Sequence, residues 1–432
     1  MKKGNIKLYA SALAALMSVS SFVSVSAADT LKGDVNSDGV VNAQDIFIYQ
    51  NYLLNNEVEK FDKTAADMDK NDNINILDLI MLKRMIIDSM SDSSAEEHTA
   101  DITFENDKIE ANGKNVTVEG SVVKITASGA YYFEGTLDDG EILVEVPDKT
   151  ADAETVKLFF NGVTIHGVSK PAVYIENAKN TSINLVEGTE NFITDGDYSS
   201  VSEETLAAVY AKDDLTIKGT GSLQIDASTQ YGIHCGADLK INGAELTVNT
   251  EAEDGIRGKK SVTVKDGDIT IEADGDGIKS TKGTVEISGG KVHVKSGKDA
   301  IQAETSVTIS GGKVSAGGDR GITAPSGVSI TGGQVLITAK DEKIDLSDGI
   351  SVGAFNLEFA EEKDKDIKLI VKSGDDEVFS VKARKKFMYA FLASDSFDTS
   401  KEYTVYTDDT QLSSASGKTF KPGSPSAYTI AG

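Results

Sequence analysis

The sequence predicts a mainly β protein, built as a parallel β-helix with a small helical module before it and an antiparallel β cap after it. Three observations predict this organisation. Short alternating strands recur about every 22 residues through the middle of the chain. Two Asp- and Asn-rich loops with the same internal spacing lie near the N-terminus. The recurrence ends near Phe355, and the strands beyond it follow no such period.

The N-terminus predicts an export signal. Lys2, Lys3 and Lys7 precede an apolar run from Leu8 to about Val25, and small residues follow at 26–28. This order is typical of a removable signal over residues 1–28. A retained single-span anchor is the alternative, but the run is short for a bilayer and no basic patch follows it. We therefore expect a secreted, extracellular protein.

The composition excludes several classes of partner. The 432 residues carry a formal charge of −26, which disfavours nucleic acid and anionic membranes as ligands. The single cysteine, Cys235, excludes an internal disulfide, and its place in an apolar pattern predicts a buried structural thiol. No tryptophan is present, so the flat aromatic platform of many cellulose binders is missing.

The two loops have the spacing of calcium ligands in an EF-hand-type loop. A hard cation takes six to eight oxygen ligands, and a glycine at position 6 allows the sharp turn between them. The first loop places Gly39 there, and its candidate ligands are Asp34, Asn36, Asp38, the Val40 carbonyl, Asn42 and Asp45. The second has Asp72 at position 6, and its candidates are Asp67, Asp69, Asn71, Asn73, Asn75 and Asp78. We expect two Ca²⁺ sites, with weaker binding in the second because Asp turns there less readily than glycine.

Each loop opens an amphipathic helix, expected from Asp45 to about Leu54 and from Asp78 to about Ile87. Each loop ends in Asp rather than Glu, and no helix is expected before it. In these features residues 31–88, within a domain expected over 29–88, resemble a type I dockerin, which implies docking to a cohesin domain of a cellulosome or cell-surface scaffold. The resemblance assigns cohesin recognition to Ala43, Gln44, Gln50 and Asn51 in one half and Ile76, Leu77, Lys83 and Arg84 in the other. Because one set is small and polar and the other apolar and basic, we expect one half to dominate docking.

Residues 89–100 are small, polar and acidic, and indicate a flexible linker. The β-helix is expected over 101–354, with three short strands per coil. Aligning the third strand of each coil gives a row in which Val or Ile points inward and the following residue outward. That outward ladder consists of Tyr174, Tyr210, His234, Arg257, Lys279 and Gln302. Tyr174, Tyr210 and His234 are candidate glycan-binding residues.

Asp254, Asp276 and Asp299 stack beside this ladder. Neighbouring carboxylates about 5 Å apart repel by about 3 kcal/mol at an effective dielectric of 20. Three interpretations follow: Arg257 and Lys279 neutralise them, calcium lies between them, or they remain solvated. As Asp also forms turns before Gly, a purely structural role is equally open.

The body as a whole resembles a clostridial family of carbohydrate-binding β-helix proteins, over about residues 102–350. The resemblance rests on the ordered series of motifs, including 125–132, 135–140, 160–165 and the Asp-Gly-Ile coils at 254–256 and 276–278. It implies a right-handed, pectate-lyase-like fold that binds calcium and plant cell-wall polysaccharide such as cellulose or pectic acid. Arg320-Gly321 and Glu342-Lys343 depart from the pattern, which puts a metal site beyond Asp299 in doubt. We read 355–432 as an antiparallel cap over the open end of the helix.

Three functions remain open from sequence: a non-catalytic polysaccharide-binding module, a calcium-dependent polysaccharide lyase on the same scaffold, and a purely architectural β-helix. The lyase would need a Lys or Arg base beside a carboxylate-bound calcium, and Lys279 with Arg257 is the candidate constellation. The binding module is the favoured interpretation.

Overall fold

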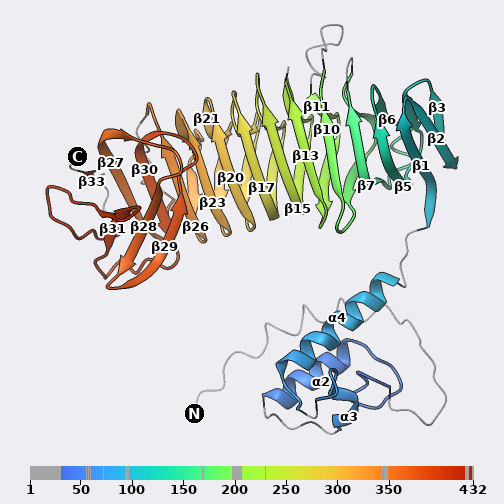
Figure 1. Cartoon of the computed structure of the whole chain (residues 1–432), viewed down its shortest axis with the longest axis horizontal. Coiled ribbons are helices and arrows are strands. Elements are labelled where there is room, and N and C mark those ends of the chain that lie inside the picture. The colour runs from blue at the N-terminus through green and yellow to red at the C-terminus, as the bar shows by residue number, and fades with distance from the viewer. Residues whose placement is uncertain are drawn as a thin grey trace. The chain divides into compact units, whose positions relative to one another are not determined.

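The computed structural model describes residues 31–54, 56, 58, 60–71, 73–92, 97–167, 170–196, 207–228, 230–342, 344, 349–423 and 428–430, without the side chains of Ala43, Arg84 and 86–92. The predicted export signal lies outside these residues. The chain forms two compact units, residues 1–97 and 98–432 (Figure 1). Within the described part, no helix combines the length and the apolar character needed to cross a bilayer.

The first unit contains α2 (Ala43–Leu53), α3 (Lys63–Ala66) and α4 (Ile76–Asp92). Both main helices begin two residues earlier than expected. For α2 the reason is Asn42, which forms a capping box with Asp45 and so ends the loop at position 9. A one-turn helix, α3, precedes the second loop, contrary to expectation, because Asp62 accepts hydrogen bonds from the backbone amides of Thr64 and Ala65.

The segment 89–100 is not a linker along its whole length. Helix α4 continues through Asp92, and strand β1 begins at His98. The prediction of a flexible tether was therefore wrong at both ends. Polar composition alone did not reveal that the start of the segment extends a helix already formed and that its end joins a strand ladder.

Side chains from both halves form the core of the first unit. Val35, Tyr49, Met68, Leu79 and Leu82 are buried together. Tyr49 is the fully buried tyrosine of this core, whereas Tyr52 stacks on Phe61 at 3.8 Å between ring centroids.

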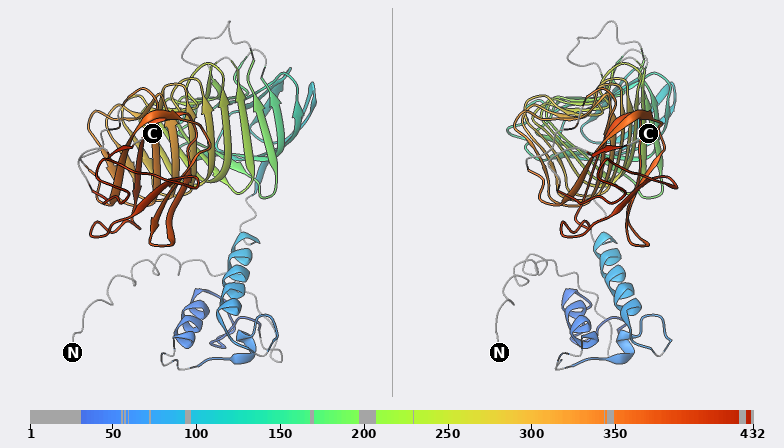
Figure 2. Two further views of the ribbon diagram at one scale, coloured as in Figure 1. Left: turned by 60° about the vertical axis from the view of Figure 1, so that its left-hand side comes forward. Right: turned by 90° about the vertical axis from the view of Figure 1, so that its left-hand side faces the viewer.

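The second unit is dominated by parallel strands stacked in successive coils (Figures 1 and 2). We call the first of its three surfaces face 1. Its strands are β3 (Val116–Glu119), β4 (Val122–Ile125), β6 (Glu141–Glu145), β8 (Val173–Asn177), β11 (Ala207–Ala211), β14 (Tyr231–Cys235), β16 (Ile256–Gly258), β18 (Ile278–Ser280), β21 (Asp299–Ala303) and β24 (Arg320–Thr323). From β4 onward each pairs in parallel with the equivalent strand of the next coil.

Two further faces complete each coil, and several strands bend from one into the other. Face 2 comprises the first halves of β5 (Gly129–Leu137), β7 (Thr155–His166), β15 (Asp238–Thr250) and β17 (Ser261–Ala273), with β9 (Asn180–Leu185), β12 (Asp214–Gly219), β19 (Thr284–Ile287), β22 (Val307–Ile309) and β25 (Val328–Ile330). Face 3 comprises their second halves, with β10 (Glu190–Thr194), β13 (Ser222–Ala227), β20 (Lys291–Ser296), β23 (Lys313–Gly318) and β26 (Gln334–Ala339). β1 (His98–Asn106) and β2 (Lys108–Gly113) form an antiparallel hairpin at the start of the stack. The mainly β class predicted from sequence is confirmed.

Regular inward stacking explains the repeat. Ile233, Ile256, Ile278 and Ile301 pair in register from coil to coil and are fully buried. The glycines before the first three of these isoleucines are required by close packing. A Cβ at Gly277 would lie 2.1 Å from Val294 Cγ1, and one at Gly255 would lie 2.4 Å from Ile271 Cγ2. Cys235 is also buried, as expected, and burial raises the pKa of its thiol to about 12.

Antiparallel strands follow the last coil, as expected for the cap. β26 pairs with β30 (Phe387–Ser394), which pairs with β27 (Gly353–Lys363). The short β33 (Tyr428–Ile430) adds to β27. A separate sheet contains β28 (Lys368–Ser373), β29 (Asp376–Lys382), β31 (Thr404–Thr407) and β32 (Thr410–Gln411). In the core of the cap, Leu336 of β26 packs with the buried phenylalanines. The cap therefore packs directly on the end of the coil stack.

Candidate functional site

The first of the two Asp- and Asn-rich loops holds its end residues, Asp34 and Asp45, in buried positions. Asp45 is fully buried and accepts hydrogen bonds from the backbone amides of Asn36 and Asn42, at 3.3 and 2.9 Å. Asp34 accepts from the amides of Asp38 and Gly39, at 3.1 and 2.9 Å. Gly39 has a φ of +90°, the turn that position 6 requires. Burial, and to a lesser degree the neighbouring carboxylates Asp34 and Asp38, raise the pKa of Asp45 to about 6.

The second loop brings three carboxylates together. One oxygen from each of Asp67, Asp69 and Asp78 lies within 4.8 Å of the others. Asp78 is fully buried and accepts hydrogen bonds from the amides of Met68 and Asn75, at 2.9 and 3.0 Å. Asp72, at position 6, lies outside the described residues.

The chemistry of both loops fits Ca²⁺. In the described part of the first unit, Asp45 and Asp78 form no ion pair with Lys or Arg, and their recorded hydrogen bonds come from backbone amides. Two carboxylates about 5 Å apart repel by about 3 kcal/mol at an effective dielectric of 20, so clustered buried ones require a cation. The oxygen-only donor set is what calcium prefers, and calcium would supply the charge that neutralises these groups.

Tyr49 links the two halves of the first unit and was missed as a functional residue. From α2, its hydroxyl donates to the Ala66 carbonyl at 3.1 Å and reaches the Asn75 carbonyl at 3.5 Å. These carbonyls lie immediately before and within the second loop. The phenol therefore fixes the loop from the opposite half-module.

The candidate cohesin-binding residues form unequal surfaces. Gln44 and Gln50 are exposed in the first half, and Asn51 is half-buried, its amide donating to the Phe47 carbonyl at 2.9 Å. In the second half Ile76 and Leu77 are 57% and 58% exposed, and Lys83 is half-buried. The side chains of Ala43 and Arg84 are outside the described set. Ile80 and Met81, which sequence did not single out, extend the apolar surface by one helical turn.

On face 1 the structure aligns the predicted ladder in register. Tyr174 pairs with Tyr210, Tyr210 with His234, His234 with Arg257, and Arg257 with Lys279. Gln302 continues the row. Tyr210 is only 7% exposed, so it offers a ligand little surface. Tyr174 and His234 are half-buried, and the rings meet at tilted or edge-on angles rather than as one flat platform.

The three aspartates beside the ladder are buried, not solvated. Asp254 and Asp276 are each 2% exposed and Asp299 is 0% exposed. Asp254 accepts a hydrogen bond from the amide of Asp276, which in turn accepts one from the amide of Asp299, both at 2.9 Å. The solvated interpretation was wrong, because the carboxylates of Asp254 and Asp276 bond to the backbone of the next coil and that of Asp299 bonds to the side chains of Arg320 and Thr323.

Basic side chains neutralise this row. Lys279 lies 2.5 Å from Asp276 and 3.7 Å from Asp254. Arg257 is 3.7 Å from Asp254, and Arg320 is 2.7 Å from Asp299. Burial raises the pKa of Asp254. Burial alone would lower the pKa of Lys279, but its hydrogen bond to Asp276 and the charge of Asp254 raise it overall. Lys279 is thus held as a cation, which is the wrong state for a general base.

Tyr231 and His234 border this charged row. Tyr231, which sequence did not single out, accepts a hydrogen bond from Arg257 at 2.6 Å, and the guanidinium lies 4.7 Å from its ring centroid. Burial and the charge of Arg257 lower the pKa of His234 to about 4, so the imidazole is neutral at pH 7.

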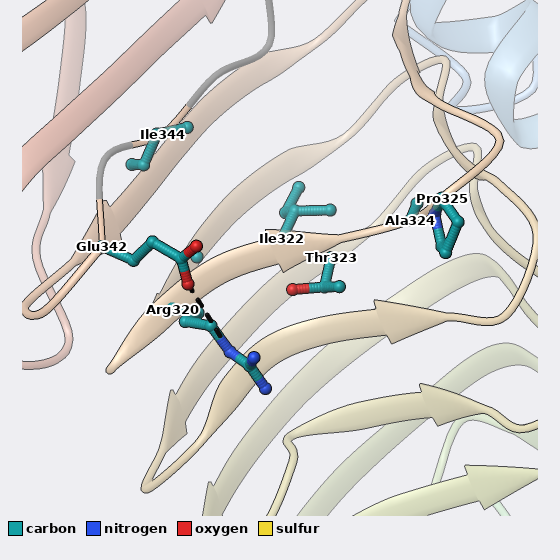
Figure 3. Close-up of a pocket in the computed structure, with 8 residues that line it drawn as sticks. Arg320, Ile322, Thr323, Ala324, Pro325, Glu342 and Ile344 are labelled. Carbon is teal, nitrogen blue, oxygen red and sulfur yellow. Dashed lines mark ion pairs between the residues drawn. The ribbon is translucent and has the colours of Figure 1, made fainter.

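A groove of about 290 Å³ lies at the far end of face 1 (Figure 3). Its walls include Arg320, Thr323, Pro325, Glu342 and Ile344. Arg320 faces Glu342 across it at 4.0 Å. The sequence signal for this groove was the departure of Arg320-Gly321 from the Asp-Gly-Ile pattern. In the structure, Arg320 and Glu342 line a charged groove at the end of the ladder.

The two units define a modular protein that joins a docking module to a carbohydrate-binding β domain. Residues 32–87 match the model of the type I dockerin domain. Residues 119–364 match the model described as carbohydrate-binding domain-containing protein, and because the match covers more than half of the chain, the protein belongs to that family. These matches confirm both resemblances found in the sequence.

A curated relative and a solved structure are each similar to part of the chain. A curated carbohydrate-binding domain-containing protein of Acetivibrio thermocellus is 37% identical over 160 residues, covering 36% of this chain and 54% of that protein. The chain thus spans about half the length of this relative. A solved structure titled as the polysaccharide lyase-like protein from C. thermocellum, a gadolinium derivative, is 32% identical, with a TM-score of 0.44 over 54% of this chain and 92% of that one.

Proposed function

We propose that the protein is a secreted, non-catalytic polysaccharide-binding component of a cellulosome. It would dock to a cohesin through its calcium-loaded dockerin and bind plant cell-wall glycans, cellulose or pectic acid, with its coil stack. The observation that carries the proposal is the presence, in one chain, of a type I dockerin and a carbohydrate-binding domain. A dockerin implies a cohesin partner, and the carbohydrate-binding family implies a polysaccharide ligand.

Within the dockerin we propose two calcium ions held by the ligand sets named from the sequence. The clustered carboxylates of the second loop, of which Asp78 is buried, and the buried Asp34 and Asp45 of the first loop support this assignment. Weaker binding in the second loop follows from Asp72 at position 6. Calorimetry on wild type should resolve two sites of unequal calcium affinity, and Asp72→Gly should make the two affinities more similar. Two equal, tight sites in wild type would contradict the assignment.

For glycan binding we propose face 1, with Tyr174 and His234 as its partly exposed rings and Tyr210 as a lesser contributor. We also propose that the coil stack is a right-handed parallel β-helix. The in-register parallel pairing supports stacking, and the handedness rests on the resemblance found in the sequence. Crystallography tests the handedness. Glycan binding by Tyr174→Ala, with Tyr406→Ala in the cap as the control, tests whether face 1 is the binding surface.

The alternative is a calcium-dependent polysaccharide lyase using Lys279 and Arg257. The raised pKa of Lys279 and its ion pairs with Asp276 and Asp254 count against it, because a base must be neutral to accept a proton. Calcium bridging of Asp254, Asp276 and Asp299 is likewise disfavoured, since amides and basic side chains already engage them.

One experiment separates these functions. The full chain is incubated with polygalacturonate, with and without calcium, while absorbance of unsaturated products is followed beside a pull-down on insoluble cellulose and pectic acid. Binding without products supports the proposal. Products that disappear in Lys279→Ala would establish the lyase, and neither binding nor products would leave an architectural role. N-terminal sequencing of the secreted protein tests the cleavage near Ala28.

A further inference from the structure

A small polar cleft lies where the cap folds against face 3. Its volume is about 70 Å³, and it is lined by His293 and Lys295 of β20, Glu272 of β17, and Lys365, Asp366 and Arg384 of the cap. The space holds a few water molecules, and therefore a carboxylate group, but it is too small to enclose a pyranose ring. A ligand could insert only a small polar group.

The cleft is built by long-range contacts on both sides. Arg384 is held in place by its neighbours: Ala383 exchanges backbone hydrogen bonds with Asp366 and Ile367, each at 2.9 Å. Lys385 donates to the Ser296 carbonyl at 2.8 Å and pairs with Asp319 at 2.5 Å. The position of the guanidinium therefore depends on the docking of cap to coils.

Arg384 lacks the partners that a half-buried guanidinium normally has. In the part of the chain that the structure describes, no hydrogen bond or ion pair to Arg384 is recorded, and its Nε is buried without an acceptor. Burial lowers its pKa, and the charges of Asp366, Asp268 and Glu272 oppose this. Arginine offers five N–H donors in a planar fork that matches a carboxylate.

The charges around the cleft favour an anion. Glu272 already pairs with Lys295 at 2.7 Å, which leaves Lys365 and Arg384 facing one carboxylate, that of Asp366. Lys365 is exposed at the rim. His293, which also lines the cleft, has its pKa lowered to about 4 by burial and by Arg384, so it is a neutral imidazole, and its Nδ1 has no hydrogen-bond partner among the described residues. A locally positive cleft in a chain of charge −26 selects negative groups.

We propose that this cleft binds the carboxylate of an acidic sugar, with Arg384 as the principal contact and Lys365 as a second cation at the rim. The sugar ring remains outside, on the border between cap and face 3. The inference rests on the proposed function in taking a glycan as ligand, but it assigns a site separate from the face 1 ladder.

The test measures binding of a galacturonic acid trimer to the full chain by calorimetry, in calcium-containing buffer. The neutral galactose trimer of the same linkage is the matched ligand. We expect the acidic trimer to bind and Arg384→Gln to weaken it at least about 10-fold, with a smaller loss in Lys365→Gln. The control Lys386→Gln, an exposed cap lysine paired with Asp364 and Glu362, should bind as wild type. Thermal melting checks that each variant folds. Because Lys365 is exposed, its substitution leaves the core intact.

Each result decides the matter. Unchanged affinity in both Arg384→Gln and Lys365→Gln, equal binding of the neutral trimer, or loss in Lys279→Gln instead would overturn the site and leave the proposed function standing. Wild type that binds cellulose but not the acidic trimer would do the same. Wild type that binds no glycan in either assay would overturn the proposed function as well.

Discussion

At the scale of single residues, the molecule relies on buried polar groups whose partners are distant in sequence. Tyr49 is the example in the dockerin, where one hydroxyl serves two carbonyls of the opposite half. The aspartate row is the example in the coils, where the carboxylates of Asp254 and Asp276 each accept from the amide of the aspartate in the next coil. Such groups stabilise one register because an unmade buried hydrogen bond is costly.

Tyr49→Phe removes the hydroxyl without creating a cavity. It leaves the Ala66 carbonyl short of a donor, so we expect the dockerin to lose about 1–2 kcal/mol of unfolding free energy and the second loop to bind calcium more weakly. Calcium titration and urea unfolding followed by circular dichroism measure both. Tyr52→Phe is the matched control, since Tyr52 stacks on Phe61 and its ring is kept. Equal effects of the two changes would contradict this role for Tyr49.

His234 gives the coil stack a pH dependence of defined sign. Its pKa is about 4 when folded and about 6.5 when unfolded, so the unfolded chain takes up the proton first as the pH falls. Its contribution is complete above pH 6.5 and is lost between pH 6.5 and 4, by up to about 3 kcal/mol. The thermal midpoints of wild type and His234→Gln should become more similar as the pH falls through this range. A parallel pH dependence would refute the assignment, and His98→Gln, which removes an exposed imidazole, is the control.

At the scale of elements, the two halves of the dockerin have the same loop chemistry, but their helices present different surfaces. Ile76, Leu77, Ile80 and Met81 present an exposed apolar stripe on α4, whereas Gln44 and Gln50 present polar groups on α2. Apolar area contributes most to affinity once it is buried at an interface. We therefore expect the second half to be the better docking surface.

Matched substitutions at loop position 11 test this asymmetry. Leu77→Asp removes an apolar contact and adds a charge, so cohesin affinity should fall at least about 30-fold, the equivalent of about 2 kcal/mol. Gln44→Asp should cost less than about 3-fold. Calorimetry with the purified cohesin measures both, and calcium binding should be unchanged in each. Equal losses would mean that both halves dock with equal weight.

Elements also show what sequence could and could not predict. The period placed Ile256, Ile278 and Ile301 in one buried row, because parallel coils stack identical positions. It did not reveal that Asp254, Asp276 and Asp299 are buried, since inward and outward positions at a corner do not follow strict alternation. It missed Arg384, because the contact of the cap with face 3 joins segments that share no repeat.

At the scale of the whole molecule, the type I dockerin and the carbohydrate-binding domain lie in separate compact units, residues 1–97 and 98–432. The first unit contains clustered carboxylates for which we propose a calcium ion, while the second has its aspartates paired with Lys279, Arg257 and Arg320. The requirement for calcium should therefore fall on one unit only.

Chelation of calcium tests that division directly. Excess EDTA should unfold the dockerin, lowering the helical circular dichroism signal and abolishing cohesin binding, because binding free energy of the ion is folding free energy of the loops. The coil stack should keep its melting temperature within about 2 °C, since no more than about 1 kcal/mol is at stake there. Cellulose retention by the full chain, measured by pull-down in the same buffer, should be unchanged. A fall in the coil melting temperature or in glycan retention on chelation would instead place calcium along the aspartate row, and Asp276→Asn should then reproduce the loss without chelator.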